Sequence, residues 1–319
     1  MKTATIRAAA IQLETRIGDT QYNLQACKAL AEQAVAQGAG WIALPEFFNS
    51  GVKFDPALVE VIEGPEGVSA QFLQRFSQQH QVVIGGSFMC RLKTAAGRNA
   101  GVRNRYLCFA NGQLVGQHDK DLPTMWEAAY YEGGGCDDTG ELGIIDDIRV
   151  GSALCWEFLR SQTARRLQGK IDVLIGGSHW WSLPQNWPAF LTRRMEQQNH
   201  ENFIRTLQQT ARLVGVPLIH ASHCGTFESA FPSVPGLRYR GELEGHTAIL
   251  DGRGNILAHR GKQQGQGFVI ADIIPGYTDM AEPITDDYWL RRRGILPTVS
   301  WVLDGFFGRL WYKKHVSGQ

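Results

Sequence analysis

The stretch GSALCWEFLR, residues 151–160, places a cysteine at the end of a short apolar run and directly before Trp and Glu. A free cysteine packs like a small hydrophobic residue, so Cys155 could be an ordinary core thiol. It could also be a nucleophile, because backbone dipoles at a turn from strand into helix favour an anion. A thiol at neutral pH is mostly protonated, so a catalytic one needs a base or a positive field from elsewhere in the chain.

Two other segments carry side chains that could supply these groups. Glu46 follows the hydrophobic run WIAL and precedes Phe47 and Phe48, surroundings that are expected to raise the pKa of a carboxylate. Lys120 opens the segment KDLPTMWE, which ends in Glu127. Taken singly, Glu46 could equally be a surface carboxylate and Lys120 a solvated lysine, since charged side chains are mostly exposed.

Three motifs carry a family resemblance when they are taken together. Leu44-Pro45-Glu46-Phe47, then Lys120 with Glu127, then Cys155 in LCWE resemble the Glu-Lys-Cys set of the nitrilase superfamily, the carbon-nitrogen hydrolases. The resemblance covers roughly residues 4–275. It implies an α/β protein with a four-layer αββα sandwich, two mixed β-sheets and at least a dimeric assembly.

The resemblance also implies a role for each of these residues. Cys155 is the nucleophile, Glu46 the general base, and Lys120 a cation that stabilises the oxyanion or imide nitrogen formed when sulfur attacks. The backbone N–H of Trp156 is a second donor, and Glu127 holds Lys120 or positions substrate or water. Ammonia or an amine then leaves, and water cleaves the resulting thioester. Neither a metal nor an organic cofactor is required for these steps.

The motifs favour the nitrilase branch, in which a nitrile is hydrolysed to a carboxylic acid and ammonia. Phe158 stands where that branch commonly has Asn, and Asp121 and Leu122 replace a more apolar pair. Amide hydrolysis by the same residues is therefore the alternative, carbamoyl-type amides included. Less favoured alternatives are acyl transfer to an amine or lipid acceptor, and a binding protein that keeps the fold without turnover.

Aromatic residues beside the motifs are expected to line the substrate pocket. Contacts with substrate are assigned to Phe47, Tyr130, Trp156 and Trp180, and the wider set adds Phe48, Trp126, Trp181 and Trp187. A pocket of this kind would favour an aromatic or bulky apolar substrate. The same side chains could equally belong to the core.

Two further motifs are interpreted as structural. HASHC contains His220, His223 and Cys224, but two histidines do not make a zinc site, and the motif ends a buried strand where satisfied histidines are common. The glycines at 133–135 lack the preceding strand and following helix that phosphate-binding glycines need, so they predict a bend.

The hydrophobic pattern alternates between strand and helix periods along the chain. Strands are expected at 4–13, 41–48, 81–89, 148–155, 171–179, 216–223 and 267–272, and helices at 23–38, 67–80, 161–169 and 195–214. Hairpins are expected to turn at Asn111-Gly112 and at Gly252 to Gly254. Parallel units mixed with hairpins indicate a mixed sheet with helices packed outside it.

The C-terminal segment is expected to be separate from the hydrolase domain, with a boundary between 1–280 and 281–319. Apolar residues repeat at helical spacing in this segment, with basic clusters on both sides: Val299, Val302, Leu303, Phe306, Leu310 and Trp311, flanked by Arg291 to Arg293 and by Lys313 and Lys314. The apolar stretch is too short to span a bilayer. Packing on a partner subunit in a homodimer or larger homo-oligomer is favoured over contact with a membrane surface.

Composition narrows the classes of partner and location. Hydrophobic residues make up 43% of the 319 residues and charged residues 20%, as in ordinary globular proteins. The net charge of +1 gives no reason to expect nucleic acid as a partner. Six cysteines without a CxxC pair argue against a disulfide framework and a zinc ribbon. No apolar run of signal-peptide length begins the sequence, and the cysteine pattern indicates reduced thiols, so a cytoplasmic location is expected. A small-molecule nitrile or amide is the substrate that the family resemblance implies.

Overall fold

The computed structural model describes residues 5–94, 96–135, 137–278, 282–291 and 294–318. The expected boundary at 280 and 281, Cys136, and Arg292 and Arg293 of the basic cluster lie outside these residues. The described part of the chain forms a 12-stranded mixed sheet and a separate two-stranded hairpin, β10 (Thr226–Ala230) and β11 (Arg238–Glu242).

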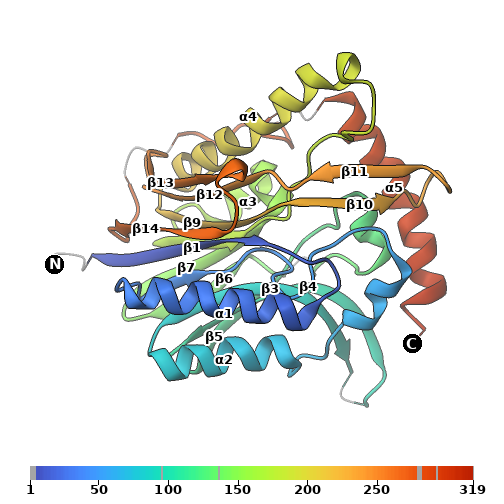
Figure 1. The fold of residues 1–319 in the computed structure, drawn as a ribbon. Coiled ribbons are helices and arrows are strands. Elements are labelled where there is room, and N and C mark those ends of the chain that lie inside the picture. Colours follow the sequence, from blue (N-terminus) through green and yellow to red (C-terminus); the bar gives the residue numbers. More distant parts are fainter. Residues whose placement is uncertain (1–4, 95, 136, 279–281, 292–293, 319) are drawn as a thin grey trace.

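The 12-stranded sheet consists of two halves that face each other (Figure 1). The strands of the first half follow the order β5-β4-β3-β2-β1, and β14 also pairs with β1. These strands are β1 (Ile6–Glu14), β2 (Trp41–Ala43), β3 (Val83–Lys93), β4 (Asn99–Ala110), β5 (Gln113–Asp119) and β14 (Gly267–Ile273). The second half has the order β6-β7-β8-β9-β12-β13; its strands are β6 (Glu141–Ile145), β7 (Ile148–Leu154), β8 (Val173–Gly177), β9 (Leu218–Cys224), β12 (Gly245–Leu250) and β13 (Ile256–Gly261).

The two halves share one hydrophobic core and are joined by one pairing of strands, the β1–β9 seam. β1 and β9 pair in parallel where Gln12 to Glu14 meet Ser222 to Cys224. Ala8 and Ala10 of β1 point into the core between the halves, where they join Ile175 of β8, while Ala9 and Ile11 point to the opposite face. This alternation with period 2 buries both faces of β1, since each face of the sheet is covered.

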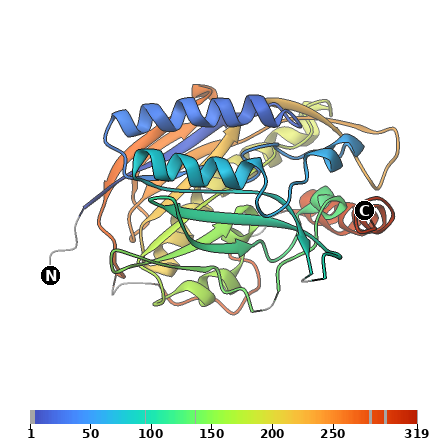
Figure 2. The same ribbon diagram turned by 90° about the horizontal axis from the view of Figure 1, so that it is seen from below.

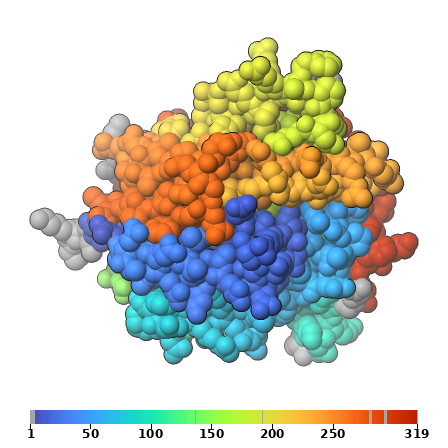
Figure 3. All heavy atoms as spheres, in the orientation of Figure 1, coloured from blue at the N-terminus to red at the C-terminus, as the bar shows by residue number. Residues whose placement is uncertain are grey.

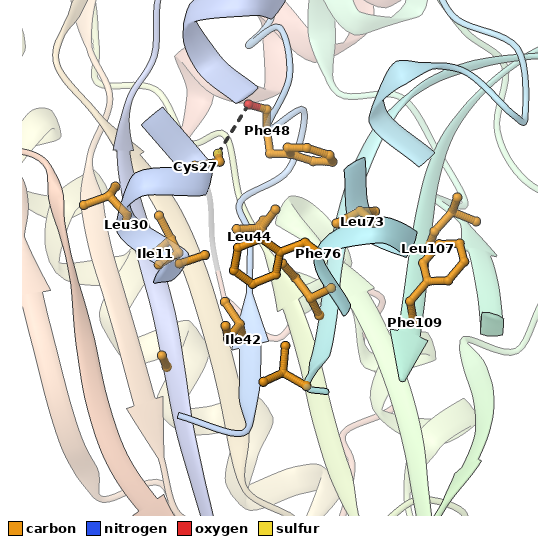
Figure 4. Packing of buried hydrophobic residues seen from close by; sticks show 14 of the residues in the cluster. Ile11, Cys27, Leu30, Ile42, Leu44, Phe48, Leu73, Phe76, Leu107 and Phe109 are labelled. Carbon is orange, nitrogen blue, oxygen red and sulfur yellow. Dashed lines mark hydrogen bonds between the residues drawn. The ribbon is translucent and has the colours of Figure 1, made fainter. Parts of the chain in front are cut away.

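Helices cover both outer faces and complete four layers (Figures 1 and 2). α1 (Thr20–Ala36) and α2 (Val68–His80) lie on the first half, and α3 (Ser161–Leu167) and α4 (Ala189–Val214) on the second. Figure 4 shows the outer core of the first half, where Leu30 of α1 and Leu73 of α2 meet Ile11 and Ile42 of the sheet. Each such buried Leu or Ile stabilises the fold by about 1.5–3 kcal/mol. The predicted αββα sandwich is confirmed, with the addition that its two sheets are joined at the β1–β9 seam.

Some boundaries differ from those expected. The strand predicted at 41–48 ends at Ala43, and Pro45, which has no backbone N–H to donate to a sheet, follows in the segment that leaves it. α4 begins at Ala189 instead of 195, and β6 and the β10–β11 hairpin were not predicted. Short 3-10 helices fill several loops: η1 (Pro56–Val61), η2 (Met125–Ala129), η3 (Cys155–Leu159) and η4 (Lys262–Gln264).

The C-terminal helix α5 (Ile295–His315) stands at one end of the sandwich, at the end opposite the N-terminus (Figures 1 and 2). Gly308 lets α5 approach η2 closely, because a Cβ at this position would lie 3.0 Å from the backbone nitrogen of Ala129. Tyr312 Oη accepts a 3.1 Å hydrogen bond from the backbone N–H of Val102. Figure 3 shows α5 along this edge of the molecule beside the β10–β11 hairpin. Among the described residues, no helix is both long and apolar enough to cross a membrane.

Candidate active site

Strand direction brings the predicted catalytic residues to one end of the sandwich. β2 runs parallel to β1 and β3. β5 runs in the same direction as β3, because two antiparallel pairings, through β4, separate them. β7 and β8 run parallel to β9, which is itself parallel to β1. The carboxyl ends of β2, β5, β7 and β8 therefore lie at the same end. Glu46, Lys120, Cys155 and His179 follow these four strands, where α/β proteins commonly bind ligands.

Lys120 lies between two carboxylates, and all three side chains are fully buried. Its Nζ donates hydrogen bonds of 2.8 Å to Glu46 Oε1 and of 2.8 Å to Glu127 Oε2. A third, longer bond of 3.3 Å reaches Thr124 Oγ1. Three N–H donors are thus matched by three acceptors, which is the condition under which a buried charge is tolerated.

Glu127 is held by its own helix as well as by Lys120. Its Oε2 accepts a 2.8 Å bond from the backbone N–H of Thr124, the cap residue of η2, and a further bond from the Tyr131 hydroxyl. This is a capping box, in which the carboxylate satisfies the free N–H at the start of a helix. Oε1 of Glu127 is buried without a hydrogen-bond partner among the described residues, so this carboxylate retains an unused acceptor.

Cys155 lies at the junction between β7 and η3 in a strained backbone conformation. Its φ is +48°, in the left-handed region that non-glycine residues rarely adopt. This conformation destabilises the folded state by about 1–3 kcal/mol. Such a turn from strand to helix presents a nucleophile at the end of a sheet. The thiol Sγ lies 4.0 Å from the backbone carbonyl of His179, and the residue lines a pocket.

Burial and charge set the protonation states of this group. Burial raises the pKa of Glu46 to about 7, with Lys120 opposing the shift and Glu127 adding to it. Burial also raises the pKa of the Cys155 thiol well above its ordinary value, and the charge of Glu46 raises it further. Burial by itself would lower the pKa of Lys120, but Glu127 and Glu46 raise it well above its ordinary value. The resting site therefore holds a neutral thiol, an ammonium and a carboxyl that titrates near neutrality.

Glu157 connects the Cys155 turn with the Lys120 loop. Its Oε2 accepts a 2.8 Å bond from the backbone N–H of Leu154, and its Oε1 accepts a 2.9 Å bond from the N–H of Asp121. The imidazole of His118 lies 2.9 Å from Oε2 and 2.6 Å from Asp138. Burial would lower the pKa of His118, but Glu157 and Asp138 raise it to about 10. A buried imidazolium and carboxylate thus position the loops that carry Cys155 and Lys120.

Replacing Glu157 by glutamine is expected to lower the free energy of unfolding by about 3 kcal/mol, since His118 would keep only Asp138 as a carboxylate partner. The folded pKa of His118 is about 10 against an ordinary 6.5, so its stabilisation is complete below pH 6.5 and is lost as the pH rises through 10. The difference between the two proteins should therefore shrink over this range, as measured by denaturant unfolding. Exposed Glu66→Gln is the control, and a pH-independent difference would contradict the coupling.

Three supporting residues around Glu46 were missed by the sequence analysis as parts of the site. Asn104 Nδ2 donates a 2.8 Å bond to Glu46 Oε1, and the backbone N–H of His179 donates a 2.9 Å bond to Oε2. His223 Nε2 donates a 2.6 Å bond to the Glu46 backbone carbonyl. Burial lowers the pKa of His223 to about 4, so the ring is neutral and structural, as expected for HASHC. The motif was visible in the sequence, but its contact with Glu46 was not.

The glycine bend at 133–135 packs against the loop that carries Lys120. The backbone N–H of Gly134 donates a 2.8 Å bond to the Lys120 carbonyl. A Cβ at Gly133 would lie 2.0 Å from the Asp121 carbonyl oxygen, and one at Gly134 would lie 2.3 Å from that of Asp119. Glycine is therefore required for close approach of two backbones.

A pocket of about 210 Å³ opens onto Cys155. Five tryptophans line it, together with Thr124 before η2: Trp126, Trp156, Trp180, Trp181 and Trp187. The β10–β11 region and α5 add Phe231, Ser233, Tyr239, Leu296, Val299, Leu303 and Asp304. Trp156 and Trp180, two of the predicted substrate contacts, are thus on the pocket wall. The contribution of α5 was not predicted.

Phe47, Phe48 and Tyr130 lie outside the pocket lining, which corrects their expected placement. Phe47 and Tyr130 are buried in a cluster with Met89 and Tyr312, and the Tyr130 hydroxyl accepts a 2.7 Å bond from the Asp55 backbone N–H. Phe48 packs in the outer core beneath α1 (Figure 4). Phe47 and Phe48 are neighbours in the segment that leaves the sheet after Ala43, and their side chains enter two different buried clusters.

The sequence of this chain matches one protein family over most of its length. The family model for carbon-nitrogen hydrolase matches residues 7–281. A four-layer sandwich with acid, ammonium and thiol at the ends of its parallel strands is the arrangement that the Glu-Lys-Cys motifs implied. The chain belongs to the carbon-nitrogen hydrolase family, the nitrilase superfamily, and it is a hydrolase of carbon-nitrogen bonds.

Individual relatives agree with this assignment. The chain is 26% identical over 292 residues to deaminated glutathione amidase from Synechocystis sp., covering 84% of this chain and 91% of the relative. It is 23% identical over 263 residues to 2-oxoglutaramate amidase from Bacillus subtilis, covering 80% and 86%. A carbon-nitrogen hydrolase from Helicobacter pylori G27 has the same fold, with a TM-score of 0.68, 20% identity and coverage of 86% and 90%. Among the described residues, no group of His, Cys, Asp and Glu is arranged to hold a metal ion.

Proposed function

We propose that this protein is an amidase that hydrolyses a non-peptide amide through a Cys155 thioester. The observation that carries the proposal is the buried Glu46–Lys120–Glu127 array, with both contacts at 2.8 Å, beside a thiol that opens into a pocket. Glu46 is the general base, Lys120 stabilises the oxyanion, and Glu127 holds Lys120 in place.

Acylation begins with a neutral thiol, because the pKa of Cys155 is raised well above its ordinary value. Glu46 removes the thiol proton as sulfur attacks the amide carbonyl carbon. The oxyanion needs a donor, and Lys120 can supply the N–H that makes only a 3.3 Å bond to Thr124, a residue on the pocket wall. The backbone N–H of Trp156, next to the nucleophile, is the proposed second donor. Protonated Glu46 then gives its proton to the leaving nitrogen.

Deacylation uses the same carboxylate a second time. Once ammonia has left, Glu46 is ionised and removes a proton from a water molecule that attacks the thioester carbonyl. The tetrahedral intermediate collapses with loss of the Cys155 thiolate, which recovers the proton from Glu46. The sum is amide plus water to carboxylic acid plus ammonia. The unused Oε1 of Glu127 is available to accept a hydrogen bond from substrate or water.

An amide is favoured over the nitrile that the sequence motifs first indicated. The two relatives from Synechocystis sp. and Bacillus subtilis, each matched over at least 80% of this chain, are both named as amidases. Phe158, which replaces the Asn of the nitrilase branch, is fully packed in the core, where its carbonyl accepts a 2.8 Å bond from Thr210. Nitrile hydrolysis by the same residues is the second candidate, and a matched nitrile and amide pair separates the two.

The pH dependence of kcat/KM tests the role of Glu46. The base must be ionised, and its pKa is about 7, so kcat/KM should fall about tenfold for each pH unit below 7 and reach a plateau above about pH 8. Glu46→Gln should lower kcat/KM by about 10²–10⁴-fold and remove this limb. Initial rates of ammonia release at several pH values measure both effects.

The control for this experiment is Glu66→Gln, a substitution at an exposed position before α2, which should keep the wild-type profile. A Glu46→Gln protein that retained the ascending limb would show that another group is the base. Peptide mapping by mass spectrometry after incubation with an amide would show an adduct confined to Cys155 in the active protein. Hydroxylamine trapping would distinguish hydrolysis from acyl transfer.

The oligomeric state and the cellular location of this protein remain predictions. α5 leaves apolar side chains exposed on its outer face, including Val302, Phe306 and Leu310, and the homo-oligomer interface is assigned to this face. Contact of this face with a membrane surface is the less favoured alternative. A cytoplasmic location likewise stays a prediction. The division of the chain into a domain 1–280 and an extension 281–319 also remains a proposal. It concerns the sequence and does not imply a separate structural unit, because α5 packs directly on η2.

A further inference from the structure

The wall of the pocket above Cys155 is mostly apolar and aromatic. Trp126 and Trp181 lie with ring centroids 4.3 Å apart, and Tyr239 meets the edge of Trp126 at 5.3 Å. The pocket volume of about 210 Å³ exceeds the 150 Å³ or so of a cavity that binds benzene. The pocket can therefore hold an aryl group in addition to the reacting amide.

The described pocket lining contains no Lys or Arg. His179 is the basic side chain present, and burial together with His223 holds its pKa well below the ordinary value, so the ring is neutral. Lys120 is fully buried behind Thr124 and is matched by Glu46 and Glu127. No described cation on the wall is therefore available to a carboxylate on the substrate.

The charged side chain on the described wall is Asp304 of α5, which is 1% exposed. Its oxygens accept hydrogen bonds from the backbone N–H of Ser233 at 3.3 Å and from the hydroxyls of Ser233 and Ser300. All three donors are neutral, and Asp304 makes no ion pair with a described residue. Its carboxyl group is therefore a hydrogen-bond acceptor at the pocket wall that no described cation neutralises.

α5 is outside the residues 7–281 that match the family, so this wall is supplied by a segment beyond the shared domain. Leu296, Val299 and Leu303 of α5 line the pocket, whereas Val302 on the same helix does not and is 58% exposed. Gly308 and Tyr312 hold the helix against η2 and β4. The helix is thus fixed in place at the pocket mouth.

We propose that α5 makes the site selective for amides whose acyl group is uncharged, bulky and apolar, aryl groups above all, and that Asp304 discriminates against acyl groups that carry a carboxylate. A substrate carboxylate would lose its hydration without gaining a cationic partner and would meet a like charge. An aryl group gains edge and face contacts with the tryptophans. This inference rests on the proposed amidase function. The Bacillus subtilis relative, by contrast, is named for 2-oxoglutaramate, an amide that itself carries a carboxylate.

Two matched substrates test the selectivity: 4-methylphenylacetamide and 4-carboxyphenylacetamide, which differ in charge at similar size. The neutral amide should have a kcat/KM at least about 100-fold higher than that of the carboxylate. Equal values, or a preference for the carboxylate, would overturn the proposal. Glutaramate serves as a second carboxylate and should be a poor substrate by a similar factor.

Variants of α5 connect the selectivity to this wall. Leu303→Ala should raise the KM of the methyl compound about 5–10-fold, while the control Val302→Ala, off the pocket on the same helix, should leave it unchanged. Asp304→Asn, which can keep hydrogen bonds to the two serines, should reduce discrimination against the carboxylate about tenfold. If Val302→Ala and Leu303→Ala behaved alike, or if Asp304→Asn kept the full ratio, the assignment to α5 would be wrong.

Binding without turnover separates this inference from the proposed function. Each amide is tested for protection of Cys155 against alkylation by iodoacetamide, read by peptide mapping with mass spectrometry. Protection by the neutral amide alone, with no ammonia released from either amide, would support the selectivity while contradicting the amidase proposal. Turnover of the carboxylates alone would support the amidase proposal and overturn the selectivity, and protection by the carboxylates alone would overturn the selectivity. A neutral amide that neither reacts nor protects would overturn the inference.

Discussion

Cys155→Ala is expected to lower kcat for amide hydrolysis by at least about 10⁴-fold, because the described pocket lining holds no other cysteine that could form the thioester. The substitution removes a sulfur atom and relieves little of the strain at φ +48°, since alanine also has a Cβ. The fold should therefore persist. Steady-state ammonia release measures the activity, and intact mass with a slow amide should show an acyl adduct on the wild-type protein and none on the variant.

Cys224→Ala is the matched control, because Cys224 is also buried but lies on β9 away from the pocket lining. It should keep nearly full activity. Retention of more than about one hundredth of the wild-type kcat by Cys155→Ala would place the chemistry elsewhere. An adduct on Cys27, Cys90, Cys108 or Cys224 in the active protein would do the same.

Lys120→Met is expected to lower both the activity and the stability of the protein. Without its ammonium, Glu46 and Glu127 remain buried with no cation between them, which should lower the free energy of unfolding by about 3–5 kcal/mol. Loss of the oxyanion donor should lower kcat by about 10²–10³-fold or more. Lys120 opposes the upward shift of the Glu46 pKa, so any residual activity should titrate above pH 7.

A second substitution separates the two effects of Lys120. Lys120→Met with Glu127→Gln removes one of the two uncompensated carboxylates, so part of the lost stability should return while activity stays absent. Lys28→Met, at an exposed position on α1, is the control and should change neither quantity appreciably. Thermal and denaturant unfolding report stability, and ammonia release reports activity. A Lys120→Met protein as stable as the wild type would contradict the shared-charge arrangement.

Much of the candidate site could be predicted because its signals are local in sequence. Glu46 and Cys155 each follow an apolar strand, β2 and β7, and parallel pairings bring the ends of these strands to the same end of the sandwich. Lys120 follows the more polar strand β5, which two antiparallel pairings orient in the same direction. Asn111 and Gly112 predict the hairpin that places Lys120 at the correct end. Glu157 is three residues from Leu154 and caps its N–H, so its role could also have been sought in the CWE motif.

The residues that hold these side chains in place could not be predicted from the sequence, because hydrogen bonds between distant positions leave no periodic signal. Asn104 meets Glu46 across 58 positions, and His223 meets the Glu46 carbonyl across 177. The placement of Phe47 and Phe48 also depends on long-range packing: the chain leaves the sheet after Ala43, and neighbouring side chains then enter two different cores.

By itself the sequence determined the family and the four-layer fold and predicted the reacting side chains, since residue type, local period and order along the chain carry that information. Only the tertiary structure decided what surrounds them. The pocket is completed by α5 and by residues beside the β10–β11 hairpin, more than 70 positions from Cys155. An aromatic or acidic residue such as Trp187 or Asp304 looks the same in sequence whether it faces solvent, core or pocket, because its surroundings are set by segments that are remote along the chain.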